Sequence, residues 1–328
     1  MSTEILVLNR EEVEQCLSMA EAIELMQQAF ARLSSGEAKA PVRTHLPIGD
    51  YKNIALFMPV VDEQLGYFAL KTVSVFPTNK AYQMPLINGS IMLYDAHTGV
   101  PLAVMDAEYI TALRTGAASG LATALLARPD SSICGIFGAG TQAETQLEAV
   151  TTVRPIREAL IFSRDPESAR SFSKRMKKRL DIDIRPATGM EELKTCDIVC
   201  TATTATNSVF NDQDLQRQVH INAVGTFQPN TTEIPMETVM RSWLIVDQRE
   251  ACMKEAGEIA MLLKTARIKS DHIRAEIGEI ANGKVDPPED WPECSLFKSV
   301  GNAVQDLYTT AAVYKIASNQ NLGKIVKL

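Results

Sequence analysis

The sequence predicts a protein of the α/β class, in which a doubly wound parallel sheet is combined with an α+β domain. Short apolar stretches alternate with helix patterns from residue 131 onward, which is the rhythm of parallel strands with covering helices. Residues 43–105 instead show apolar stretches separated by turn clusters that contain Gly, which is typical of antiparallel hairpins. A chain of 328 residues is long enough for two such domains.

The first part of the chain predicts helices and hairpins. Residues 5–8 alternate as a short strand, and apolar residues recur at helical spacing over 19–33, between Ser18 and Gly36. The hairpin strands are expected at 54–60, 67–75, 90–94 and 100–105. An Ala-rich pattern over 106–127 then predicts a long helix.

The second part predicts the parallel sheet. Strands are expected at 133–137, 159–163, 182–185, 197–203, 219–225 and 243–247. Helices are expected at 141–152, 166–178, 190–194, 250–263, 272–282 and 301–317. If the last helix returns to the first domain, the domain with the parallel sheet is an insertion.

A glycine turn follows the first strand of this series. Residues 138–143 read GAGTQA, the G-x-G-x-x-A form of a dinucleotide fingerprint. Gly138 permits the tight turn, Gly140 lets backbone N–H groups approach a pyrophosphate, and Ala143 allows close packing of helix on strand. Such turns also occur without a ligand, but this one stands where dinucleotide binding needs it. The phosphates are expected to contact Gly138, Ala139, Gly140, Thr141 and Gln142.

The end of the second strand bears on which nicotinamide cofactor is bound. An acid at this place accepts the ribose hydroxyls in sites that prefer NAD. Here the strand ends in Ser163 and Arg164, whose hydroxyl and guanidinium suit a 2′-phosphate, and Asp165 comes one position late. The sequence therefore favours NADP(H) and leaves use of NAD(H) open. In the alternative interpretation, Arg164 is a solvated residue at the start of a helix.

Composition narrows the class of protein. The net charge is −7 and no basic block is present, so a nucleic-acid partner is not expected. The N-terminal sequence lacks a basic and apolar leader, and no apolar run is long enough to cross a bilayer, so no membrane association and a cytoplasmic location are expected. The six cysteines are scattered, and the spacing of Cys196 and Cys200 favours core packing over a metal site.

Six blocks of sequence resemble the ornithine cyclodeaminase and mu-crystallin family. They are PVRTHL at 41–46, FALKTVSVFP at 68–77, ALRTGAASG at 112–120, GAGTQA at 138–143, AVGTFQPN at 223–230 and FKSVGNAVQDL at 297–307. The resemblance implies a Rossmann-type domain at 119–299, inserted in an α+β domain for substrate binding and dimerisation at 1–118 plus 300–328. It also implies a homodimer.

By motif position, Arg43, Lys71 and Arg114 look like the substrate-binding residues of this family. An amino or imino acid needs its carboxylate bound, and Arg offers a planar bidentate fork for it. Without the resemblance, Lys71 would be interpreted as an exposed lysine on an edge strand. With it, Lys71 is expected to bind substrate and to donate a proton to an imine nitrogen.

The resemblance adds further contacts to the cofactor. These are Thr115, Thr201, Ala202, Thr203, Val224, Gly225, Ser299 and Val300. The carboxyl ends of strands are where an open α/β sheet binds its ligand, so 201–203 and 224–225 are also expected on physical grounds.

One position departs from the cyclodeaminase pattern. Phe227, assigned here to the substrate site, stands where those enzymes have a catalytic Asp, and a phenyl ring cannot transfer protons. The expected activity is therefore reduction of a cyclic imino acid, Δ1-pyrroline-2-carboxylate or its six-membered homologue Δ1-piperideine-2-carboxylate, to L-proline or L-pipecolate by NAD(P)H. The alternatives are a cyclodeaminase lyase with bound NAD, an alanine dehydrogenase, and a non-catalytic crystallin-like protein that binds NADPH and a small ligand.

Overall fold

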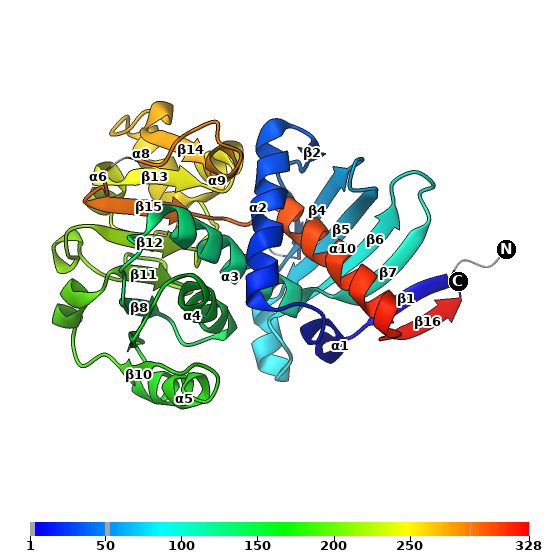
Figure 1. Ribbon diagram of the computed structural model, residues 1–328, viewed down its shortest axis with the longest axis horizontal. Helices are drawn as coiled ribbons and strands as arrows, with labels where there is room; N and C mark the ends of the chain where they lie inside the picture. Colours follow the sequence, from blue (N-terminus) through cyan, green and yellow to red (C-terminus); the bar gives the residue numbers. More distant parts are fainter. Residues whose placement is uncertain (1–3, 50–52, 289, 328) are drawn as a thin grey trace. The chain divides into compact units, whose positions relative to one another are not determined.

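The computed structural model describes residues 4–49, 53–288 and 290–327, which belong to two compact units (Figure 1). Unit 1 comprises Met1–Arg114 and Asn302–Leu328, and unit 2 comprises Thr115–Gly301. The first boundary lies inside helix α3 (Ala107–Leu126), as does the boundary expected at 118/119. The second follows the last strand of unit 2, near the one expected at 299/300.

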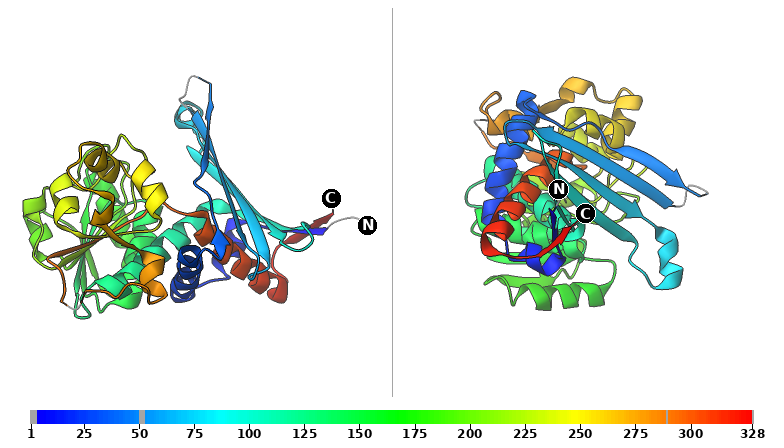
Figure 2. Two further views of the ribbon diagram at one scale, coloured as in Figure 1. Left: turned by 90° about the horizontal axis from the view of Figure 1, so that it is seen from above. Right: turned by 90° about the vertical axis from the view of Figure 1, so that its right-hand side faces the viewer.

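Unit 1 is built on a mixed eight-stranded sheet with the order β16-β1-β7-β6-β5-β4-β2, in which β3 pairs with β4. Its strands are β1 (Glu4–Leu8), β2 (Ala38–Lys39), β3 (Thr44–Ile48), β4 (Asn53–Asp62), β5 (Tyr67–Val75), β6 (Ile87–Asp95), β7 (Pro101–Asp106) and β16 (Lys324–Lys327). Its helical segments are α1 (Arg10–Glu14), α2 (Met19–Ser35), η1 (Pro77–Tyr82) and α10 (Ala303–Gln320), besides the start of α3. Helix α10 packs on β4, β5 and β6, and α2 lies beside α10 (Figure 2).

Local signals explain why these elements form where they do. Ser18 caps α2 and forms a capping box with Glu21, and Gly36 ends the helix in the left-handed conformation. The two predicted hairpins are present, because β4 pairs with β5 and β6 pairs with β7, both antiparallel. In this arrangement β5 is a central strand, hydrogen-bonded to β4 and β6.

Unit 2 contains an eight-stranded parallel sheet with the order β10-β9-β8-β11-β12-β15-β13-β14. Its strands are β8 (Ile133–Phe137), β9 (Glu158–Phe162), β10 (Asp183–Pro186), β11 (Ile198–Thr201), β12 (Val219–Ala223), β13 (Trp243–Val246), β14 (Ile273–Glu276) and β15 (Cys294–Lys298). Its helical segments are α4 (Thr141–Val153), α5 (Pro166–Met176), η2 (Met190–Thr195), η3 (Asp212–Asp214), α6 (Met236–Arg241), α7 (Arg249–Glu255), α8 (Gly257–Lys264), η4 (Ser270–His272) and α9 (Ile277–Ala281). The order from β10 to β12 is that of a Rossmann fold, so the predicted fold class is confirmed.

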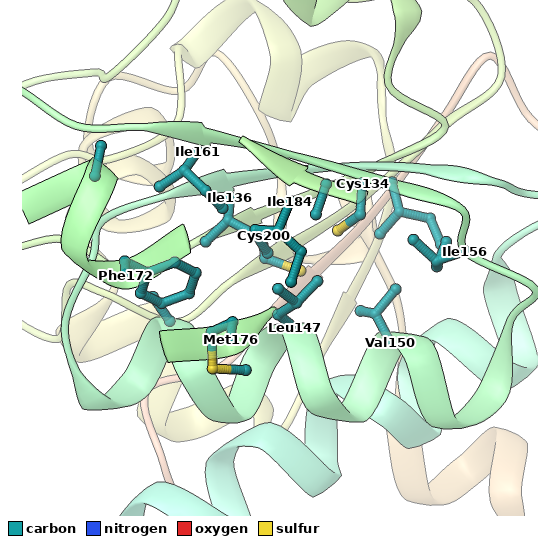
Figure 3. Packing of buried hydrophobic residues seen from close by; sticks show 14 of the residues in the cluster. Cys134, Ile136, Leu147, Val150, Ile156, Ile161, Phe172, Met176, Ile184 and Cys200 are labelled. Carbon is teal, nitrogen blue, oxygen red and sulfur yellow. The ribbon is translucent and has the colours of Figure 1, made fainter. Parts of the chain in front are cut away.

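The core of this sheet is formed where α4 and α5 cover β8, β9 and β11 (Figure 3). Leu147 and Val150 of α4, with Phe172 and Met176 of α5, pack against strand residues such as Ile136. All six cysteines are buried free thiols. Among the described residues, no helix is long and apolar enough to cross a membrane.

Two sequence predictions about unit 2 are wrong, and one strand was missed. The helix expected at 272–282 begins as strand β14 and becomes helix α9 only at Ile277. The helix expected at 250–263 is broken at Ala256 into α7 and α8. Strand β15, which the sequence did not predict, lies between β12 and β13, so strands far apart in the chain pair with it.

Candidate active site in the two units

The carboxyl ends of the strands in unit 2 border a cleft of about 810 Å³. The glycine turn after β8, the end of β9 and the segment after β11 line it. Seven of the predicted cofactor residues line this cleft, namely Gly138, Ala139, Gly140, Ser163, Arg164, Ala202 and Thr203. A cleft of this size at this edge of the sheet suits an extended dinucleotide.

Glycine suits the two positions of the turn for different physical reasons. Gly138 has φ +107°, and a Cβ there would lie 2.6 Å from the carbonyl oxygen of Ala202, so the protein itself requires glycine. Gly140 has an ordinary extended conformation, and a Cβ there would meet no atom within 4 Å. Open space in front of Gly140, at the N-terminus of α4, fits a bound pyrophosphate.

The polar residues at the end of β9 make different contacts. Asp165 is the N-cap of α5, because its carboxylate accepts hydrogen bonds from the N–H groups of Glu167 and Ser168 and from the Ser168 hydroxyl. Arg164 is exposed and lines the cleft beside Ser163. Asp165 also lines the cleft and is exposed, so the acid and the guanidinium are both accessible from it, and the acid is in addition engaged as the cap of its own helix.

The other predicted cofactor residues lie outside the cleft lining. Thr141 and Gln142 start α4, and Thr115 lies within α3, where its carbonyl accepts a hydrogen bond from Gln146. Thr201 is fully buried at the end of β11. Val224 and Gly225 follow β12, and Ser299 and Val300 follow β15.

Two buried carboxylates that the sequence interpretation missed hold these strand ends. Glu233 accepts hydrogen bonds from the backbone N–H groups of Thr203 and Gly225. Asp247 accepts from the Ser299 hydroxyl at 2.7 Å and from the N–H groups of Val300 and Gly301. No short motif marks either acid, since each acts on segments distant in the sequence.

A buried charged cluster occupies unit 1. Lys71 of β5 is 2% exposed, and its Nζ lies 2.6 Å from Oδ2 of Asp306 on α10. Nε of Arg114 lies 3.2 Å from Oδ1 of the same carboxylate, and its Nη1 donates to Gln305 at 2.9 Å. The interpretation of Lys71 as an exposed edge lysine is wrong, because β5 is central and the side chain is buried.

The surroundings of Lys71 set its protonation. Burial lowers the pKa of Lys71, the carboxylate of Asp306 opposes that shift, and the positive charges of Arg114 and Arg43 lower it further, to about 7. Arg43, half-buried between β2 and β3, thus acts on the same group. A lysine with this pKa can give and take a proton near neutral pH.

Asp306 and Gln305 were missed as site residues. Both lie in the block 297–307, where the pair Gln-Asp in the first turn of the last helix was the available signal. Phe227 lies in unit 2, half-buried in the segment after β12. Among the described residues, no group of three His, Cys, Asp or Glu side chains could hold a metal ion.

A Rossmann-type unit joined to an α+β unit with a buried cationic cluster defines a class of two-unit dinucleotide-binding proteins. Within that class, the model of the ornithine cyclodeaminase/mu-crystallin family matches residues 3–321, and this chain belongs to that family. The resemblance predicted from the six sequence blocks is confirmed.

Individual relatives cover almost the whole chain. A Δ1-pyrroline-2-carboxylate reductase of Bacillus cereus is 35% identical over 98% of this chain and 100% of its own length. The structure of Thermococcus litoralis Δ1-pyrroline-2-carboxylate reductase in complex with NADH and L-proline is 40% identical, covers 98% of this chain and 99% of that one, and has a TM-score of 0.93. An archaeal alanine dehydrogenase dimer with bound NAD is 34% identical, covers 99% of this chain and 100% of that one, and also has a TM-score of 0.93.

Proposed function

We propose that this protein reduces Δ1-pyrroline-2-carboxylate to L-proline with a nicotinamide cofactor. The observation that carries the proposal is the buried cluster of Lys71, Arg114 and Asp306, which combines cations for a carboxylate with a group that titrates near pH 7. The similarity of the whole chain to two reductases of this substrate supports the same reaction.

The residues of unit 1 have distinct roles in this reaction. Arg43 and Arg114 bind the substrate carboxylate, and Lys71 donates a proton to the ring nitrogen. The cofactor, when bound in the cleft of unit 2, supplies the hydride for the C=N carbon. One hydride and one proton convert the imine to the secondary amine, and Lys71 is then reprotonated from water.

The residue at 227 separates reduction from deamination. Loss of ammonia needs a group that accepts and returns protons, which the phenyl ring of Phe227 cannot do. We assign Phe227 to the substrate site, where an apolar side chain excludes the water that would open the ring. We therefore favour reductase over lyase.

For the cofactor, we propose a preference for NADP(H), with NAD(H) as a second cofactor. Ser163, Arg164 and Asp165 all line the cleft; the first two suit a 2′-phosphate, and the carboxylate of Asp165 is occupied as an N-cap. The two solved relatives bind NADH and NAD, which supports NAD(H) as the second cofactor. Dissociation constants for NADPH and NADH decide the preference, and Arg164→Ala is expected to weaken NADPH binding alone.

A second candidate is reductive amination of pyruvate, since an alanine dehydrogenase is 34% identical over nearly the whole chain. The two activities are separated by a substrate panel run with both cofactors. It contains Δ1-pyrroline-2-carboxylate, Δ1-piperideine-2-carboxylate, pyruvate with ammonia, and ornithine. Cofactor oxidation only with pyruvate and ammonia, or ammonia release from ornithine, would replace the proposal.

We further propose a cytoplasmic homodimer. Unit 1 exposes large apolar side chains on β3, at the end of η1, in the segment after η1 and at the start of β6, namely Leu46, Tyr82, Met84 and Ile87. Apolar side chains in such numbers suit an interface with a second copy. The alanine dehydrogenase relative is a dimer, and six free thiols suit a reducing compartment. Light scattering of the purified protein tests the oligomeric state.

A further inference from the structure

Two fully buried charged side chains lie at the carboxyl end of β15. Lys298 is the last residue of this strand and Glu258 lies in the first turn of α8. Both side chains are 0% exposed, and Nζ lies 2.9 Å from Oε1. Burial would lower the pKa of Lys298, but the carboxylates of Glu258 and Glu233 outweigh burial and the pKa is raised. Lys298 is therefore charged inside the unit.

The ammonium of Lys298 also binds the backbone of another segment. Its Nζ donates hydrogen bonds to the carbonyl oxygen of Thr226 at 2.9 Å and to the hydroxyl of Thr226 at 3.2 Å. Thr226 follows β12 and directly precedes Phe227. The buried charge is thus bonded to the peptide that leads into Phe227.

Glu233 binds the residue before Thr226, which is Gly225. One of its oxygens accepts from the N–H of Gly225 at 2.9 Å, and the other accepts from the N–H of Thr203 at 2.7 Å. A Cβ on Gly225 would clash with this carboxylate and with the carbonyl of Thr203. The segment 225–226 is therefore tied to the end of β11, where Thr203 lines the cleft.

Stability alone does not explain the pair of Lys298 and Glu258. The desolvation of two buried charges offsets most of their attraction, so an apolar pair of similar volume would stabilise the fold equally well. Neither residue lines the cleft. We propose that Lys298 and Glu258 are positioning residues that, through Thr226, fix the peptide carrying Phe227 and so hold its phenyl ring in place for the imine. This inference rests on the role proposed for Phe227.

The test replaces the pair by uncharged side chains of similar length, Lys298→Met with Glu258→Met. Amide hydrogen exchange without cofactor is expected to accelerate over 224–232 and to stay unchanged over 138–146. In steady-state kinetics we expect kcat/KM for the cyclic imine to fall about tenfold or more, while the dissociation constant of NADPH changes by less than about twofold. The control is Lys177→Met with Asp183→Asn, an exposed ion pair between the end of α5 and β10 in the same unit, which should change neither the exchange nor the kinetics.

The outcomes separate the two proposals. Unchanged exchange over 224–232 together with unchanged kcat/KM overturns the positioning role. If the double variant does not fold, Thr226→Val keeps the buried ion pair and removes the hydroxyl that accepts from Lys298, and a smaller change in the same two measurements is expected. Absence of turnover by the unmodified protein with any cyclic imine overturns the proposed function, and the exchange data then still decide whether the pair fixes this segment.

Discussion

At the scale of single residues, the chemistry of Lys71 depends on one carboxylate. Asp306 contacts both Lys71 and Arg114, so it holds two cations that would otherwise repel each other in a buried place. Of the influences on the pKa of Lys71, the charge of Asp306 is the main one that raises it. Residues far apart in the sequence thus set one proton equilibrium.

This gives a pH prediction for Asp306→Asn. As a proton donor, Lys71 is active when protonated, so kcat for imine reduction should fall as pH rises through about 7. Without the carboxylate the pKa of Lys71 drops, and the decline should move to lower pH by about one unit or more. Profiles of kcat from about pH 5 to about pH 9, recorded for both proteins, measure the shift. A decline at the same pH in both would show that Lys71 is not the titrating group.

The two glycines of the turn make a matched pair. Gly140→Ala should leave the melting temperature unchanged, because its Cβ would meet no protein atom, but should weaken cofactor binding about tenfold or more. Gly138→Ala should destabilise unit 2 by about 1–3 kcal/mol, because of its positive φ and the carbonyl of Ala202. Thermal unfolding and cofactor titration check both. Undiminished binding by Gly140→Ala would mean that no phosphate lies at this glycine.

At the scale of elements, the C-terminus of α3 is capped from outside the helix. The guanidinium of Arg154, just after α4, donates to the carbonyl oxygens of Thr123, Ala124 and Ala127 at 2.7–2.9 Å and to that of Arg128. The last four carbonyls of a helix have no partner within it, and this single side chain binds two of them together with two carbonyls just beyond the helix. It thereby joins α3 to α4.

Arg154→Met should therefore destabilise the protein by about 2 kcal/mol, since it keeps the apolar stem but leaves several carbonyls without a donor. Urea unfolding measures the loss. Arg170→Met is the control, because Arg170 forms only an exposed pair with Glu167 within α5 and should cost less than about 0.5 kcal/mol. Equal effects of both substitutions would contradict the capping role.

Elements differ in how well the sequence predicts them. Helix α2 has a capping box and a terminal glycine, and β8 precedes a glycine turn, so local signals were sufficient. Strand β15 is five residues long and pairs with β12 and β13, which are distant in the chain, so no local pattern distinguished it. Asp306 was missed for the same reason, because its partners Lys71 and Arg114 become neighbours only when α10 packs in unit 1.

At the scale of the whole molecule, unit 1 depends on a buried carboxylate for its stability in acid. Asp62, at the end of β4, accepts hydrogen bonds from Arg32 of α2 and Tyr308 of α10. Burial would raise the pKa of Asp62, but the hydrogen bonds from Arg32, from the N–H of Leu65 and from Tyr308 lower it to about 2. Ionised Asp62 therefore holds two helices against the sheet.

The sign of the pH dependence follows from this lowered pKa. The stabilisation, about 2 kcal/mol, is complete above the ordinary carboxyl pKa near 4 and is lost as pH falls toward about 2. Asp62→Asn should lower the free energy of unfolding of unit 1 at about pH 6. The difference from the unmodified protein should shrink as the pH falls toward about 2. Urea titrations along this range are the measurement, and a constant difference would contradict it.

The path of the chain between the units has a consequence for how such proteins can be recombined. The chain leaves unit 1 at Arg114 and returns at Asn302, and in unit 1 these segments are joined, because Gln305 donates to the carbonyl oxygen of Arg114 and accepts from its guanidinium. Exit and entry therefore share one small region. A gene rearrangement could exchange residues 115–301 for another dinucleotide-binding module through only two joints, while Lys71, Arg114 and Asp306 stay on the recipient framework. Cofactor preference and the side chain at position 227 would then be inherited with the module, and the residues of the charged cluster with the framework.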